Sequence, residues 1–131
     1  MSIRISWTTP EHTAALITFD GRWAWRDIDG MVAGLNALDS TAQHPYDLIV
    51  DGRNTTLWEP DLLGKMRADF TTPRLIHNRL TLIVGVDEFT RVLIEAIPAL
   101  PGLGRLKFFF FDTPEAALVF SANYTETPTS E

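Results

Sequence analysis

Residues 80–120 read LTLIVGVDEFTRVLIEAIPALPGLGRLKFFFFDTPEAALVF, and this stretch decides the fold. The apolar run Leu80–Val84 is typical of a strand that is covered on both faces. A helix is predicted next, because apolar residues at positions 89, 92, 93, 96, 97 and 100 share one face at helical spacing. Asp87 precedes this helix as a cap residue, and Pro98 and Pro101 end it.

The second half of the stretch repeats the pattern. Phe108–Phe111 predicts another buried strand, and residues 112–115 (Asp-Thr-Pro-Glu) open a last helix with a cap residue and a proline in the first turn. Strands that alternate with helices in this way form a mainly parallel sheet with right-handed crossovers. The stretch therefore predicts an α/β fold.

The residues before position 80 extend the same architecture. Residues 3–7 alternate between apolar and polar side chains and residues 14–19 are mostly apolar, which predicts an opening β-hairpin. A helix follows from Trp25 to Leu38, in which Gly30 and Gly34 would permit close packing on the sheet. The third strand is Tyr46–Val50, ended by a turn at Asp51-Gly52, and residues 60–70 form a further helix.

The expected order is therefore β-β-α-β-α-β-α-β-α, with the first strand antiparallel and at or near an edge of the sheet. We expect one domain over residues 1–124, followed by a polar, disordered tail at 125–131. A chain of 131 residues with 45% hydrophobic residues can form its own core.

Composition limits the function classes. The net charge of −6 opposes a general role in binding nucleic acid or an anionic membrane, because both attract positively charged proteins. The absence of cysteine excludes disulfides and thiol chemistry and suits a cytoplasmic protein. No apolar run approaches the roughly 20 residues that a membrane helix needs. We expect no cofactor.

Nearly the whole chain resembles the STAS-like superfamily, whose best-known members are the bacterial anti-sigma-factor antagonists (SpoIIAA-like). The hairpin carries the resemblance together with YDLIVDGRN (46–54), LTLIVGVDEFTRVLIEAI (80–97) and KFFFFDTPEAALVF (107–120). It implies a small, stand-alone bacterial member with a non-enzymatic regulatory role, in which a protein partner binds the loop after the third strand. In this chain that surface is Arg53, Asn54, Thr55, Thr56 and Trp58.

The same loop departs from the family pattern. Regulatory members carry a phosphorylatable serine there, whereas residues 51–60 read DGRNTTLWEP and contain none. Thr55 and Thr56 are the candidates for phosphorylation, which would add about −1.5 to −2 charge. The other interpretation is an ordinary loop in which these hydroxyls bond to local backbone.

Four strands end in or near an aspartate: Asp20, Asp51, Asp87 and Asp112. The carboxyl ends of parallel strands share one edge, where open α/β proteins usually bind ligands, and a row of carboxylates there could hold Mg²⁺. Helix capping and turn formation explain the same residues more simply. The three histidines show neither metal-ligand spacing nor a nucleophile partner.

Three tryptophans, Trp23, Trp25 and Trp58, are expected near this same edge. They could line an apolar cleft for a small ligand or a protein, or pack the starts of helices. The leading hypothesis is thus a protein-interaction module with an unidentified protein partner, and a homodimer is a further expectation through Phe108–Phe111. The alternatives are a small-ligand-binding domain and, third, a metal-dependent enzyme.

Overall fold

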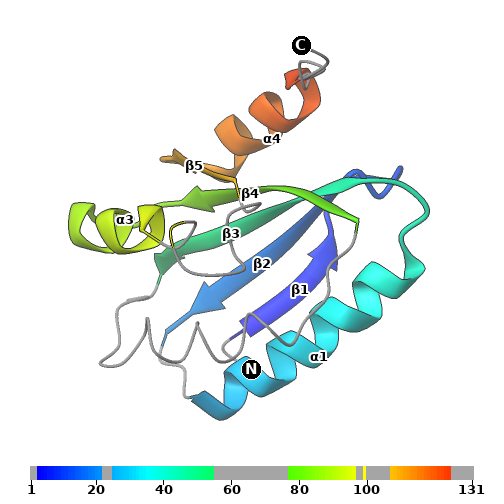
Figure 1. Cartoon of the computed structure of the whole chain (residues 1–131), viewed down its shortest axis with the longest axis horizontal. Helices are drawn as coiled ribbons and strands as arrows, with labels where there is room; N and C mark the ends of the chain where they lie inside the picture. Colours follow the sequence, from blue (N-terminus) through cyan, green and yellow to red (C-terminus); the bar gives the residue numbers. More distant parts are fainter. Residues whose placement is uncertain (1–2, 22–24, 55–76, 97–98, 100–106, 125–131) are drawn as a thin grey trace.

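A computed structural model describes residues 3–21, 25–54, 77–96, 99 and 107–124. These residues form one five-stranded sheet and three helices (Figure 1). In chain order the elements are β1 (Ile3–Trp7), β2 (Ala14–Asp20), α1 (Trp25–Thr41), β3 (Tyr46–Asn54), β4 (Asn78–Val84), α3 (Glu88–Glu95), β5 (Phe108–Phe111) and α4 (Pro114–Asn123). The predicted α/β class is confirmed. The helix predicted over residues 60–70 and the predicted tail at 125–131 lie outside the described residues.

The strands follow one another across the sheet in the order β1-β2-β3-β4-β5. β1 pairs with β2 antiparallel, and the pairs β2–β3, β3–β4 and β4–β5 are parallel. The prediction that the first strand is the antiparallel one, at an edge, is confirmed. The carboxyl ends of β2, β3, β4 and β5 therefore lie at one edge of the sheet. In Figure 1 this is the edge next to α3.

Strand alternation divides the core between the two faces of the sheet. One face carries Ile17 and Leu48, which belong to a cluster packed against α1 through Leu35. The opposite face carries Ile49 and Leu82, which belong to a cluster packed against α4 through Ala117. β4 is buried along its length from Leu80 to Val84, as its apolar run predicts for a strand covered on both faces.

An ion pair between a buried carboxylate and a partly exposed arginine joins α4 to the sheet. Arg79 of β4 donates from Nε to Asp47 Oδ1 at 2.8 Å and from Nη2 to Asp47 Oδ2 at 2.6 Å. The same guanidinium donates to the backbone carbonyls of Ser121 and Tyr124, and the Ser121 hydroxyl donates to Asp47. The Asp47 side chain is 1% exposed. A buried carboxylate of this kind needs such partners, because burial of an unpaired charge is costly.

Two sequence predictions are corrected. The turn predicted at Asp51-Gly52 is part of β3, which runs on to Asn54 because β4 pairs with Asp51 and β2 pairs with Asn54. The strand Phe108–Phe111 is half-buried rather than buried, since it pairs only with β4 among the described strands. The described helix α3 ends at Glu95, and positions 97 and 100 of the predicted apolar stripe lie outside the described residues.

The two glycines of α1 differ in their surroundings. A Cβ on Gly34 would lie 3.0 Å from Ile5 Cδ1 of β1, so this glycine does permit close packing of α1 on the sheet. A Cβ on Gly30 would meet no atom within 4 Å, so close packing does not explain that glycine. Among the residues that the structure describes, no helix is long and apolar enough to cross a membrane.

Candidate functional site

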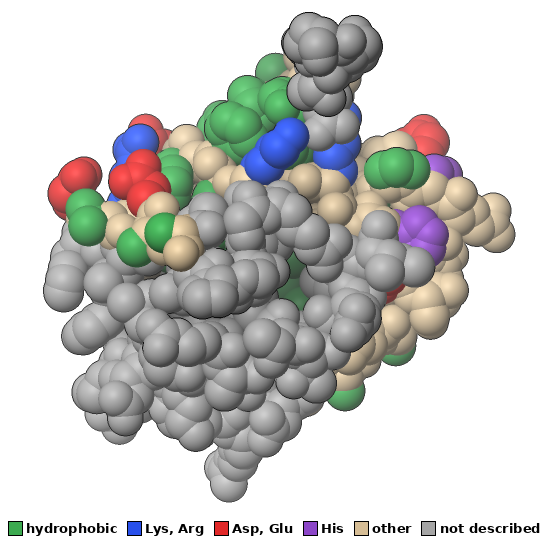
Figure 2. Space-filling view, in the orientation of Figure 1, with side chains coloured by type: hydrophobic (Ala, Val, Ile, Leu, Met, Phe, Trp, Pro, Cys, Tyr) green, Lys and Arg blue, Asp and Glu red, His purple; other side chains and the backbone are tan. Residues whose placement is uncertain are grey.

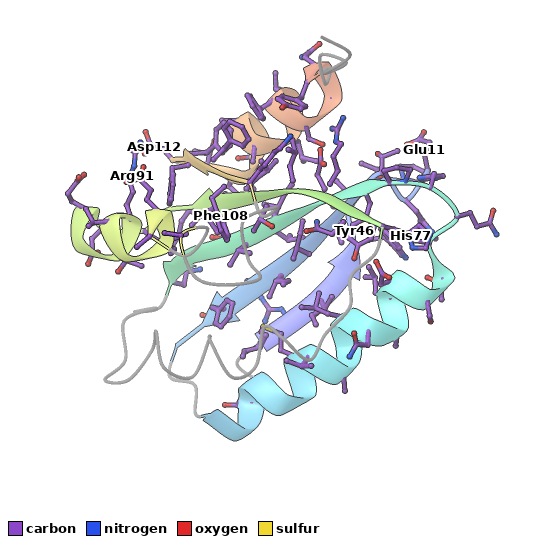
Figure 3. All side chains as sticks on the ribbon, viewed as in Figure 1. Glu11, Tyr46, His77, Arg91, Phe108 and Asp112 are labelled. Atoms are coloured by element: carbon purple, nitrogen blue, oxygen red, sulfur yellow. The ribbon has the colours of Figure 1, made fainter. Side chains whose placement is uncertain are left out.

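The candidate site lies at the carboxyl edge of the parallel strands. Figure 3 labels Arg91 and Asp112 at this end of the molecule and Glu11, Tyr46 and His77 at the other. Figure 2 shows acidic and basic side chains next to one another at the α3 end. A mixed surface of this kind favours specific pairing with another charged surface over attraction of any one polyanion.

Arg53 makes three hydrogen bonds with the Asp51 carboxylate at this edge. Asp51 Oδ1 accepts from the Arg53 backbone N–H at 3.1 Å and from Arg53 Nε at 3.0 Å. Asp51 Oδ2 accepts from Arg53 Nη2 at 3.0 Å. The Asp51 side chain is only 6% exposed, whereas the Arg53 side chain is 43% exposed. A buried carboxylate thus fixes a guanidinium that faces solvent.

Gly85 provides the space that the Arg53 side chain occupies. It follows β4 directly, has a φ of +77°, and donates its N–H to the carbonyl of Phe111 at 2.9 Å. A Cβ at this position would lie 2.2 Å from Arg53 Cγ and 3.1 Å from Arg53 Cα. Glycine is therefore needed here both for the positive φ and for the close approach of the Arg53 side chain.

The predicted row of aspartates does not form a common carboxylate cluster. Asp20 pairs with Arg4 at 3.8 Å, and Asp51 pairs with Arg53. Asp87 caps α3, as predicted, by accepting from the Thr90 N–H at 2.7 Å, and this bond holds the pKa of Asp87 below its usual value. The described residues contain no group of three histidine, aspartate or glutamate side chains that could hold a metal ion.

Asp112 is exposed and does not cap α4. The N-cap of that helix is the next residue, Thr113, whose hydroxyl accepts from the Ala116 N–H at 3.1 Å, and Pro114 begins the helix. Thr113 and the proline confirm the predicted start of this helix.

The ionisation of Asp51 makes a testable contribution to stability. Burial raises the pKa of this carboxyl, but its hydrogen bonds with Arg53 and the charge of Arg53 outweigh burial and bring the pKa below the ordinary 3.8. A lowered pKa in the folded state stabilises the fold above the ordinary pKa, and the contribution is lost as the pH falls through the folded-state pKa.

We therefore expect the free energy of unfolding of the wild type to fall below about pH 4 more steeply than that of Arg53→Ala. In the variant, the Arg53 side chain no longer lowers the pKa of Asp51, so the effect of burial, which raises it, dominates. Urea denaturation at a series of pH values measures the difference, with Arg4→Ala as the matched control for loss of an exposed arginine. Equal slopes for the wild type and Arg53→Ala would show that this pair does not influence the acid response.

The opposite end of the sheet brings together residues that sequence spacing did not connect. Asp39, at the end of α1, accepts from Tyr46 Oη at 3.0 Å and from the His77 N–H at 3.2 Å. The His77 Nδ1 lies 3.5 Å from Asp39 Oδ2 and has no hydrogen-bond partner among the described residues. Burial and Asp39 together raise the pKa of Tyr46 above its usual range, so its hydroxyl stays protonated and continues to donate.

The other two histidines lie at this same end. The His12 ring stacks on Trp7 at 4.4 Å between ring centroids, and His44 Nε2 lies 3.0 Å from the Glu11 carbonyl oxygen. Figure 2 shows the histidines on the side of the molecule away from α3. One sequence signal could have found this grouping: each histidine comes shortly before a strand that joins the parallel part of the sheet.

Most of the remaining predicted site residues fall outside the part of the chain that the structure describes. Thr55, Thr56, Trp23 and Trp58 lie outside the described residues, and so does the side chain of Trp25. Arg53 and Asn54 are described and exposed, at the end of β3. The apolar cleft and the phosphorylation site therefore stay predictions. Comparison with known proteins gave no match among family models, curated proteins or solved structures.

Proposed function

We propose that the chain is a non-enzymatic protein-interaction module that binds its partner at the carboxyl edge of the sheet, where Arg53 and Asn54 end β3. The observation that carries this proposal is the solvent-facing guanidinium of Arg53, which is hydrogen-bonded to the buried carboxylate of Asp51. Arginine residues are enriched among the side chains that contribute most to protein interfaces. A side chain held in one conformation before binding loses less conformational entropy when a partner binds.

Two carboxylates of the edge support an interaction role over a catalytic one. Asp51 is committed to Arg53 and Asp87 to the start of α3, so neither carboxylate is available as a general base without breaking a structural bond. A catalytic carboxyl would instead be expected to lie within reach of a substrate and to have a pKa close to the working pH. The STAS-like resemblance supports the same function, and it stays a prediction.

The proposal predicts that Arg53→Ala weakens partner binding under conditions in which circular dichroism shows the variant to be folded. Wild type, Arg53→Ala and Arg4→Ala would be used as baits in lysate of the source cells, and retained proteins would be quantified by mass spectrometry. We expect a protein that binds the wild type and Arg4→Ala but is depleted about tenfold or more on Arg53→Ala, because loss of one such side chain costs more than 1 kcal/mol.

That protein must then bind the purified chain directly, and its affinity for Arg53→Ala must be lower than its affinity for the wild type and for Arg4→Ala. A Thr55→Glu/Thr56→Glu bait tests whether the adjoining segment belongs to the same surface, and reduced retention is expected. Equal retention of the purified partner by the wild type and Arg53→Ala would contradict the proposal. So would the failure of every bait to retain a protein specifically.

A further inference from the structure

Asp51 occupies only one of the two hydrogen-bonding sides of the Arg53 guanidinium. Its oxygens accept from Nε and from Nη2, which together form the side of the group nearest the arginine stem. Arginine has five N–H donors, so both hydrogens of Nη1 and one of Nη2 remain. None of these three has a hydrogen-bond acceptor among the described residues. One N–H of Nη1 and the remaining N–H of Nη2 form an end-on pair of donors, on a different edge of the guanidinium from the edge that Asp51 binds.

We propose that this end-on pair, which we call the Arg53 fork, binds the carboxylate of an aspartate or glutamate side chain of the partner protein. The inference rests on the proposed function and adds the chemistry that the partner must present. Two parallel N–H donors match the two oxygens of a carboxylate, and such bidentate pairs are stronger and more specific than a single charged contact.

The structure holds the Arg53 fork in place from two sides. Asp51, which is almost fully buried, fixes the guanidinium plane and the Arg53 backbone N–H at once. Gly85 lies against the side-chain stem, where any Cβ would collide with Arg53 Cγ. The bond to Asp51 also raises the pKa of Arg53, so the group remains charged throughout the range in which proteins are folded.

The surrounding charge favours a carboxylate over a phosphate group. Asp51 and Glu115 both place negative charge near the guanidinium, and their attraction contributes to its raised pKa. A phosphate monoester carries nearly two negative charges at neutral pH, so these two carboxylates repel it more than a singly charged carboxylate. Glu115 is exposed in the first turn of α4, and its negative charge acts on the guanidinium of Arg53.

Acetate and inorganic phosphate are suitable probes. Each is titrated into the full chain at constant ionic strength, and NMR follows the guanidinium signals of Arg53 and the amide signal of Gly85. We expect saturable shifts with acetate, tighter acetate binding in Glu115→Gln, and weaker binding of phosphate than of acetate. Arg53→Lys keeps the charge and loses the fork, so the Gly85 shift should disappear. Arg4→Lys is the matched control and should respond as the wild type does.

Tighter binding of phosphate, or no saturable response of Arg53 to acetate, would overturn the inference. The purified partner separates this failure from failure of the proposed function. If Arg53→Ala loses the partner and Arg53→Lys restores it, Arg53 acts as a simple positive charge, so the fork is wrong and the interaction surface stands. If lysine leaves binding reduced about tenfold, as expected for loss of a bidentate contact, the fork is supported.

Discussion

Arg79→Ala is expected to lower the free energy of unfolding by about 3–5 kcal/mol, which is the usual cost of removing one partner from a buried ion pair. Asp47 would lose both bonds from the guanidinium and would remain in a site where its side chain is 1% exposed. The bonds from Arg79 to the Ser121 and Tyr124 carbonyls would be lost as well, so the attachment of α4 to the sheet would weaken.

Urea denaturation at neutral pH measures this effect. Arg4→Ala is the control, because Arg4 pairs with Asp20 at 3.8 Å on the surface and such exposed pairs contribute roughly 0–1 kcal/mol. The double variant Asp47→Leu/Arg79→Met should be less destabilised than Arg79→Ala, since it leaves no unpaired charge behind. If Arg79→Ala lowers the free energy of unfolding no more than Arg4→Ala does, the Asp47–Arg79 pair is not needed for stability.

Tyr46→Phe is expected to lower the free energy of unfolding by about 1–3 kcal/mol, because it leaves the buried carboxylate of Asp39 short of one hydrogen bond. Tyr46 is 1% exposed and Asp39 is 4% exposed, so water cannot readily replace the missing hydroxyl. Phenylalanine keeps the ring and therefore the edge-on contact with Trp7, at 5.3 Å between ring centroids. The effect thus reports the hydrogen bond rather than lost packing.

The matched control is Tyr124→Phe. Tyr124 is half-buried beside Phe109 and Phe120, and its described contacts are made by the ring and the backbone. Its stability should stay within about 0.5 kcal/mol of the wild type. Equal denaturation midpoints for Tyr46→Phe and the wild type would mean that Asp39 finds another donor when the hydroxyl is removed.

The first of these predictions concerns a contact that links distant parts of the chain. Asp47 and Arg79 are 32 residues apart, and Ser121 lies a further 42 residues along. Neither residue belongs to a motif, so no local pattern pointed to them. The partnership exists because β3 and β4 are neighbours in the sheet and α4 returns across the same face.

The sequence likewise predicted some features of the candidate site and missed others. The sequence placed Arg53 and Asn54 after the third strand, and it identified Asp87 as a helix cap from its position before an apolar stripe. It could not show that Asp51 binds Arg53 rather than forming a turn with Gly52. Asp-Gly is typical of turns in isolation, yet here the neighbouring strands supply backbone partners that continue β3 to Asn54.

The sequence by itself determined the order of the described elements, the parallel character of the sheet and the caps at Asp87 and Thr113. These follow from hydrophobic periodicity and from side chains that bond to nearby backbone, both of which act over a few residues. Only the tertiary structure decided that Phe108–Phe111 is half-buried and that Asp51 fixes Arg53 beside Gly85. Those outcomes depend on which strands become neighbours, because a parallel sheet joins residues that are separated by a whole crossover.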